Sequence, residues 1–346
     1  MKLEALFGKT LEELKNITKL CDLPGFTAKQ LAEWLYKKDA PSIMEMTNIS
    51  LKNRNILSEQ YEVGRVSPSK VQTSTDGTKK YLFASAGGRY IEAAYIPDEK
   101  RATLCVSSQV GCKMGCLFCM TGQQGFQSHL TAGEIVNQIQ SLPEFAKLTN
   151  VVYMGMGEPF DNIEEVLKSL EILTSDYGYG WSPKRITVSS IGIIPGLKEF
   201  LTRSKCHLAI SLHSPFEEER LKLMPVQHVY PIREVLKVIR NFDFGAQRRV
   251  SFEYIMFKGL NDTAAHVKEL ARLLNGIHCR INLIRFHPIP NTPLEGSDDA
   301  TIKRFQKGLE EKGIVTTVRA SRGLDIFAAC GLLSTKELVK SKEADF

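Results

Sequence analysis

The stretch that decides the fold is residues 102–119, ATLCVSSQVGCKMGCLFC. Its first part, residues 102–108, is rich in apolar and β-branched residues, which is typical of a buried strand. Its second part carries Cys112, Cys116 and Cys119 in a CxxxCxxC spacing, with Phe118 directly before the last cysteine. A strand that runs into a cysteine-rich loop predicts a reactive site at the carboxyl end of that strand.

The pattern of strand followed by helix continues downstream of this stretch. Five more strand-like runs occur at residues 150–156, 185–190, 207–213, 249–255 and 280–286. Segments with helical periodicity lie between these runs or after them. They are Ala132–Leu142, Ile163–Ser175, Pro195–Thr202, Ile232–Asn241, Ala264–Leu274 and Thr301–Lys312. Six βα repeats predict an α/β fold with a parallel sheet, closed as a partial (β/α)6 barrel. The polar residues at the strand ends should then meet at one mouth.

The two segments that precede this region differ from each other in their predicted secondary structure. Residues 1 to about 60 have helical periodicity, whereas residues 71–96 read as short strands with turns at Asp76-Gly77 and Gly87-Gly88. We therefore expect an N-terminal helical domain with a β linker over residues 1–94, a core barrel over 95–320 and a C-terminal segment over 321–346. A last strand at 314–321 and a short charged helix ending at Phe346 are also expected.

Composition narrows the class of protein. The net charge of +6, from 45 basic and 39 acidic residues, is compatible with a nucleic-acid partner but does not require one. The N-terminus lacks a continuous apolar segment, and no long apolar window occurs, so neither a secretory signal nor a membrane span is expected. Four of the eight cysteines fall within residues 105–119. Clustering of this kind indicates metal or redox chemistry in the cytoplasm.

The cysteine triplet fits an iron–sulfur cluster. Three thiolates can bind three irons of a [4Fe–4S] cubane and leave the fourth iron open to a small molecule. The alternative is a structural zinc site completed by Cys105. Closed zinc sites usually pair two cysteine or histidine knuckles, and no second knuckle follows here. The spacing therefore favours iron.

A second motif, GMGEP at residues 155–159, follows the second predicted strand. Its glycines would let the backbone approach a ligand closely, and Glu158 offers a carboxylate to an ammonium group. Taken alone, the motif could be an ordinary turn at a strand end.

These motifs resemble those of the radical S-adenosylmethionine (SAM) superfamily. The likeness extends, in order, through Glu92, residues 95–97, residues 101–112, residues 123–126 and Ala328–Gly331. This pattern resembles the dual-specificity RNA (adenine-C2) methyltransferases of the RlmN type. The related Cfr-type C8 methyltransferases share much of it.

The resemblance implies a [4Fe–4S] cluster on Cys112, Cys116 and Cys119, with SAM as the second cofactor. It implies methylation of adenine C2 in 23S rRNA, at the peptidyl-transferase centre, and in tRNA, 3′ to the anticodon. The N-terminal domain would help to bind RNA, and flavodoxin or ferredoxin would supply electrons. Three further residues receive catalytic roles: Cys330 as methyl carrier, Cys105 as the thiol that releases the product, and Glu92 as base.

The same resemblance implies a set of SAM contacts. They are Gly157, Glu158, Ser189, Ser211, the backbone of Leu212, His213 and His287. His287 departs from the family pattern, which more commonly has asparagine before the proline. A neutral imidazole can still donate one hydrogen bond and accept another.

Other interpretations stay open at this point. Cys330 could be a small buried side chain, and Glu92 a solvated strand carboxylate. The chain could be a C8 methyltransferase of the Cfr type. It could also be a zinc-stabilised RNA-binding factor without catalysis, although that function gives no reason for GMGEP, Glu92 or Cys330.

Overall fold

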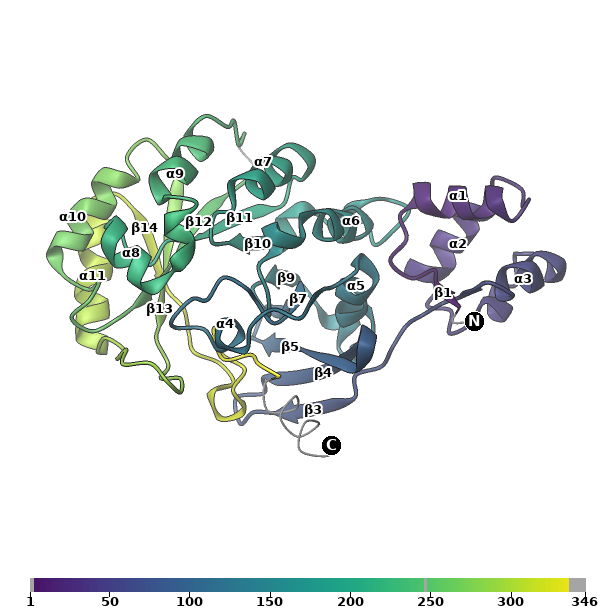
Figure 1. The fold of residues 1–346 in the computed structure, drawn as a ribbon, viewed down its shortest axis with the longest axis horizontal. Coiled ribbons are helices and arrows are strands. Elements are labelled where there is room, and N and C mark those ends of the chain that lie inside the picture. Colours follow the sequence, from purple (N-terminus) through teal and green to yellow (C-terminus); the bar gives the residue numbers. More distant parts are fainter. Residues whose placement is uncertain (1–2, 246–247, 336–346) are drawn as a thin grey trace.

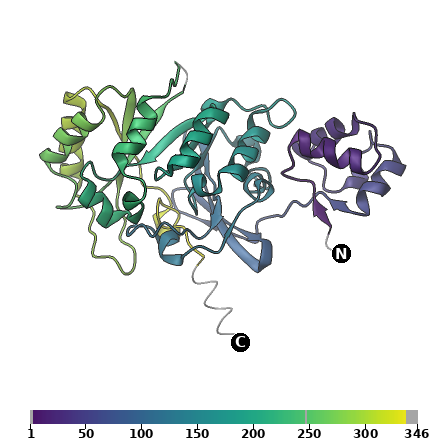
Figure 2. The ribbon, with the colours of Figure 1, turned by 45° about the horizontal axis from the view of Figure 1, so that its top comes forward.

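A computed structural model describes residues 3–245 and 248–335. It shows a large α/β body with a smaller N-terminal helical domain beside it (Figures 1 and 2). Within the described residues, a ten-stranded sheet has the order β14-β13-β12-β11-β10-β9-β6-β5-β4-β3. Its strands are β3 (Lys70–Thr73), β4 (Lys79–Ser85), β5 (Arg89–Pro97), β6 (Ala102–Cys105), β9 (Asn150–Tyr153), β10 (Ile186–Ser190), β11 (His207–Ser211), β12 (Val250–Met256), β13 (Cys279–Arg285) and β14 (Val315–Val318).

From β6 to β14 the neighbouring strands are parallel and follow one another in sequence order. The helices that connect them lie on the outside of the curved sheet (Figure 1). This arrangement confirms the predicted partial barrel, and the predicted last strand extends it as β14. The connecting helices are α5 (Ala132–Gln140), α6 (Ile163–Thr174), α7 (Ile194–Arg203), α9 (Ile232–Arg240), α10 (Ala264–Leu273) and α11 (Asp299–Glu311).

Two short helices were not predicted, α4 (Met120–Gln124) after the cysteines and α8 (Glu217–Leu223) after β11. Each is too short to show helical periodicity in the sequence. A two-stranded antiparallel sheet of β7 (Gln109–Val110) and β8 (Ser128–His129) closes the base of the cysteine loop. The charged helix predicted to end at Phe346 lies outside the described residues.

The antiparallel strands β3, β4 and β5 belong to the main sheet. β5 pairs with β4 on one side and with β6 on the other, and Ala94 is opposite Cys105. The boundary expected between residues 94 and 95 therefore falls inside β5. Alternating strands and turns predicted these elements, but the pairing of β5 with β6 depends on long-range register, which the local sequence does not reveal.

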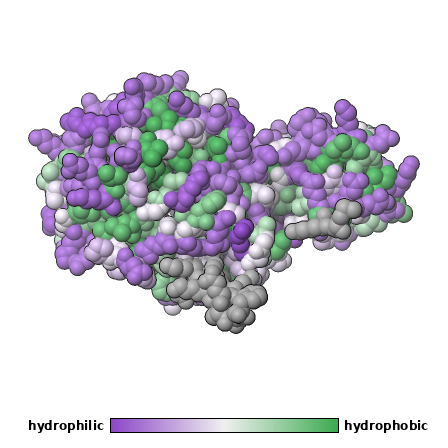
Figure 3. Space-filling view, viewed as in Figure 1, coloured by the Kyte–Doolittle hydropathy of each residue, from purple (hydrophilic) through white to green (hydrophobic). Residues whose placement is uncertain are grey.

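The N-terminal domain has its own apolar core, which includes Leu14, Leu31 and Leu35. Its first helix begins at a capping box in which Thr10 and Glu13 satisfy each other's backbone N–H groups. Apolar side chains gather on part of its surface (Figure 3). Its elements are β1 (Glu4–Ala5), α1 (Leu11–Leu20), α2 (Thr27–Tyr36), α3 (Leu51–Ser58) and β2 (Tyr61–Glu62).

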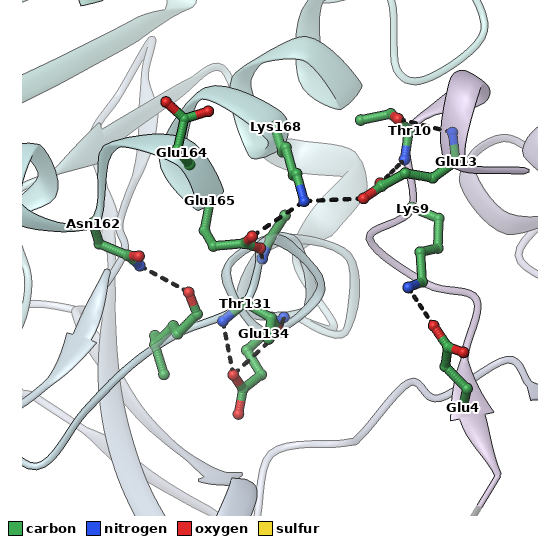
Figure 4. A network of polar contacts seen from close by, with 12 residues as sticks. Glu4, Lys9, Thr10, Glu13, Thr131, Glu134, Asn162, Glu164, Glu165 and Lys168 are labelled. Carbon is green, nitrogen blue, oxygen red and sulfur yellow. Dashed lines mark hydrogen bonds and ion pairs between the residues drawn. The ribbon is translucent and has the colours of Figure 1, made fainter. Parts of the chain in front are cut away.

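This domain docks against α5 and α6 of the α/β body. Val136 and Ile172 of those helices belong to the N-terminal core cluster. Lys168 of α6 bridges Glu13 at 2.9 Å and Glu165 at 3.2 Å (Figure 4). Such partly exposed ion pairs contribute little free energy, so the apolar contacts dominate the docking.

A close backbone approach at this interface predicts a destabilising substitution. A Cβ atom at Gly133 would lie 2.5 Å from the carbonyl oxygen of Phe7. We expect Gly133→Ala to lower the free energy of unfolding by about 1–3 kcal/mol, because overpacking forces the domain off α5. Denaturant unfolding measures the change. The matched control is Gly25→Ala, where a Cβ would meet nothing within 4 Å; equal stability of the two variants would contradict the docking.

Candidate active site

The cysteine loop is fixed at both ends by backbone hydrogen bonds. Cys112 N donates to Gly125 O at 3.2 Å, and Leu117 N donates to Leu223 O at 3.0 Å. Gly111 has φ +72°, and a Cβ there would collide with Gly125 O. The sequence thus needs glycine at position 111 to bring the two ends of the loop together.

The three predicted ligands, Cys112, Cys116 and Cys119, line one cavity of about 810 Å³. Burial raises the pKa of Cys112 to about 12 and also raises the pKa of Cys116 and Cys119. Thiolates at these positions therefore need nearby positive charge, such as that of bound metal. Within residues 3–245 and 248–335, no three His, Cys, Asp or Glu side chains are grouped to hold a single metal ion. A cubane differs in this respect, because each thiolate binds a separate iron.

The GMGEP turn forms another wall of the same cavity. Gly157 has φ +99°, and a Cβ there would clash with Gln109, whose side chain accepts a hydrogen bond from Glu158 N at 2.8 Å. The Glu158 carboxylate accepts hydrogen bonds from Phe160 N and Ile191 N, both at 3.0 Å. Burial raises the pKa of Glu158 to about 7. Each oxygen keeps lone-pair capacity for a further donor.

Polar residues at the ends of β10 and β11 complete this cavity. Ser189, Ser211 and His213 all line it. The backbone N–H of Leu212, a predicted contact, is instead directed to Glu253 O at 3.0 Å. His213 Nδ1 accepts a hydrogen bond from Ile255 N at 3.0 Å, and burial lowers the His213 pKa to about 3. The imidazole is therefore neutral, and its Nε2 carries the proton.

His287 lies in a second cavity of about 1530 Å³. Its Nε2 is 2.8 Å from Ser321 Oγ. Arg101 and Arg322 line the same cavity, which makes this region more basic than the cysteine cavity. Five of the seven predicted SAM contacts thus line the first cavity, whereas Leu212 and His287 do not.

The two cavities meet at Cys330. Cys330 and Arg319 line both of them. Arg319 Nε lies 3.4 Å from Oε2 of Glu253, a buried carboxylate on β12. The sequence analysis missed this pair. A charged residue inside the apolar run VSFEYIM was the signal that could have found Glu253, because buried charges are usually paired.

The three residues with predicted catalytic roles share one face of the β4–β6 sheet. Cys105 is buried, and Ala94 and Ala328 pack against it. Burial and the nearby Cys330 raise the pKa of the Cys105 thiol to about 12. Glu92 Oε2 accepts a hydrogen bond from Ser334 N at 2.9 Å, four residues beyond Cys330. The structure therefore disagrees with both alternative interpretations: Glu92 is buried and not a solvated strand carboxylate, and Cys330 is exposed and not a small buried side chain.

Residues 323–335, which belong to the C-terminal segment, cover this face. Gly323 N donates to Asp76 Oδ2 at 2.8 Å, and Ser74 Oγ donates to Asp325 at 2.5 Å. At the other end, Thr121 Oγ1 donates to Leu333 O at 2.6 Å. Hydrogen bonds on both sides therefore hold the part of the segment that carries Cys330. Cys206 and Cys279 line neither cavity.

Comparison with known proteins agrees with this geometry. Residues 106–274 match the family model of the radical SAM superfamily. Residues 5–63 match the ribosomal RNA large subunit methyltransferase N-terminal domain. The fold and the cysteine cavity thus define a radical SAM enzyme.

Relatives over nearly the full chain identify the family. The chain is 60% identical over 334 residues to the "Probable dual-specificity RNA methyltransferase RlmN" of Parabacteroides distasonis, covering 96% of this chain and 97% of that protein. It is 42% identical to the "Dual-specificity RNA methyltransferase RlmN" of Syntrophus aciditrophicus, covering 95% and 96%. The crystal structure of a radical SAM methyltransferase from Sphaerobacter thermophilus matches with a TM-score of 0.88 and 38% identity, over 95% of this chain and 99% of that one. The chain belongs to the RlmN family of radical SAM RNA methyltransferases. In the part that the structure describes, no helix is long and apolar enough to cross a membrane.

The proximity of the two cysteines can be tested by oxidation. We expect mild oxidation to join Cys105 to Cys330, faster at higher pH because the raised pKa of Cys105 limits its thiolate. Non-reducing peptide mapping by mass spectrometry identifies the link. Cys206, which is 1% exposed, serves as the control and should stay a free thiol. A Cys105 that stays free while Cys330 pairs elsewhere would contradict the placement.

Proposed function

We propose that this enzyme methylates C2 of adenine in 23S rRNA and in tRNA, with Cys330 as an intermediate methyl carrier. The observation that supports the proposal most strongly is the position of Cys330, where the cysteine cavity meets the second, more basic cavity. A methyl group on Cys330 would therefore be accessible both from the cysteine cavity, where the cofactors would bind, and from the second cavity, where the RNA base would bind. The names of the relatives, which describe dual-specificity RNA methyltransferases, agree with two RNA substrates.

The residues of the first cavity fit the two cofactors. Cys112, Cys116 and Cys119 would hold a [4Fe–4S] cluster, since the raised pKa values of these thiols call for a cationic partner. The carboxylate of Glu158 and the Nε2–H of His213 would hold SAM. Bound together, the cluster and SAM supply a methyl group and a 5′-deoxyadenosyl radical.

Chemistry explains why a radical route is needed. Adenine C2 is an electron-poor carbon, and the methyl group of SAM is an electrophile, so direct polar transfer would pair two electrophiles. In the proposed route, Cys330 takes a methyl group from SAM, the 5′-deoxyadenosyl radical takes one hydrogen atom from that methyl group, and the resulting carbon radical adds to C2. The adduct then gives up its unpaired electron, for which the oxidised cluster would be the acceptor. Glu92 then removes the C2 proton.

Release of the product falls to Cys105. Its thiolate attacks the sulfur of Cys330, a Cys105–Cys330 disulfide forms, and the bond between that sulfur and the methylene carbon breaks. The electron pair of the broken bond stays on the carbon, which takes up a proton and becomes the new methyl group. A thiol reductant then restores both cysteines. The packing of Cys105 beneath the C-terminal segment supports this role.

Several finer points stay predictions. A flavodoxin or ferredoxin as electron donor rests on the family resemblance, and the cytoplasmic location rests on the clustered cysteines. Methylation at C8, as in the Cfr type, remains the alternative, because it uses the same carrier chemistry. The experiment below separates the two positions.

The test is to map the methylated carbon. RNA treated with the iron-loaded enzyme, SAM and a reductant is digested, and its nucleosides are compared by mass spectrometry with 2-methyladenosine and 8-methyladenosine. We expect the C2 product from the natural enzyme and none from Cys330→Ala, which should still bind about four irons per chain.

Cys206→Ala is the matched control, because Cys206 is buried away from both cavities, and it should retain activity. A C8 product would show that the regiochemistry is wrong. Full methylation by Cys330→Ala would show that Cys330 is not the methyl carrier. Stoichiometric zinc without iron in anaerobically purified protein would favour the alternative of a zinc-stabilised RNA-binding factor.

A further inference from the structure

Lys80 of β4 lies against Glu92 of β5 inside the site. The register pairs Lys80 with Ala94 and Leu82 with Glu92, so Lys80 and Glu92 are diagonal neighbours on one face of the sheet. The Lys80 Nζ lies 2.9 Å from Glu92 Oε1, and the two side chains are only 11% and 9% exposed. The pair is therefore a buried ion pair, in contrast to the mostly exposed pairs elsewhere on the surface.

Within residues 3–245 and 248–335, the other contacts of Glu92 are neutral. Its Oε2 accepts the hydrogen bond from Ser334 N, and its backbone N–H is 3.4 Å from Met156 Sδ. Ser107 Oγ donates to its carbonyl oxygen at 2.6 Å. Of the described groups that contact Glu92, Lys80 is the charged one.

Two opposing effects act on the carboxyl group of Glu92. Burial raises its pKa, whereas the charge of Lys80 and its hydrogen bond lower it, and the net direction is upward. A buried carboxylate without a cation would take up a proton, because the low-dielectric surroundings disfavour the charged form. Without Lys80, Glu92 would lose much of its capacity to act as a base near neutral pH. With Lys80, the pKa of Glu92 is still above its usual range, so Glu92 is a stronger base than a solvent-exposed glutamate.

We propose that Lys80 is a positioning residue that keeps Glu92 ionised and directed for removal of the C2 proton. The inference rests on the proposed function. In the step itself, the C2–H bond breaks, its electron pair stays in the ring, and the proton bonds to a carboxylate oxygen of Glu92. Lys80 keeps its own proton, so the pair changes from ammonium–carboxylate to ammonium–carboxylic acid. The Lys80 Nζ fixes the position of Oε1, and the Ser334 N–H fixes Oε2.

The test compares pH–rate profiles of the natural enzyme and Lys80→Met. Removal of the cation should shift the acid limb of the profile to higher pH, since each unit of pKa rise lowers the ionised fraction about tenfold. We expect at least about a tenfold loss of RNA methylation near neutral pH, with partial recovery at alkaline pH. Methylation of Cys330 should persist in Lys80→Met, and a covalent protein–RNA adduct through Cys330 should accumulate at low pH.

Two further variants make each outcome decisive. Lys79→Met removes the neighbouring ion pair, Lys79–Glu144 at 2.7 Å, and should leave the profile unchanged. Lys80→Arg keeps the charge and should keep the profile of the natural enzyme, even if Lys80→Met does not fold. An unchanged profile in a folded Lys80→Met, or loss of Cys330 methylation in both Lys80 variants, would overturn the inference. Absence of RNA methylation by the natural enzyme would instead overturn the proposed function.

Discussion

The packing of the C-terminal segment on the face of β4–β6 is the interaction on which the rest of the active site depends. Small side chains make this close packing possible, because Ala94 and Ala328 leave room for the backbone above Cys105. The hydrogen bonds that the carboxylates of Asp76 and Asp325 accept fix one end of the segment. An exposed cysteine near the chain end thereby becomes part of a site that the barrel alone would leave incomplete.

Burial sets the electrostatic character of this site. It raises the pKa of Cys105, Glu92 and Glu158 and lowers that of His213, so each group favours its neutral form. Ionised forms require a cation close by. For Glu92 that cation is Lys80, and for the thiols of the cysteine loop it would be iron. Ionised side chains are therefore expected in this site only where a group of opposite charge lies close by.

The sequence predicted much of the fold, because strands such as 150–156 and helices such as Ile163–Ser175 have clear local periodicity. It also predicted that Ser189, Ser211 and His213 would lie at one mouth, since parallel strands end on the same side. The boundary expected between residues 94 and 95 falls inside β5, whose pairing with β4 and β6 is a long-range property that the local sequence does not show. For the same reason the sequence analysis did not predict two ion pairs of the site. They are Lys80–Glu92, which depends on strand register, and Arg319–Glu253, which depends on the path of the chain. The position of His287 in the second cavity likewise depends on how the loop after β13 turns, which no motif specifies.

The covalent link between RNA and Cys330 tests the central claim most directly. Cys105→Ala removes the thiol that would release the product and leaves the carrier and the base in place. After reaction with RNA, SAM and reductant, the account predicts an adduct joined through Cys330 that survives a denaturing gel and is removed by ribonuclease. Normal turnover by Cys105→Ala, or the absence of both the adduct and methylated Cys330, would contradict it.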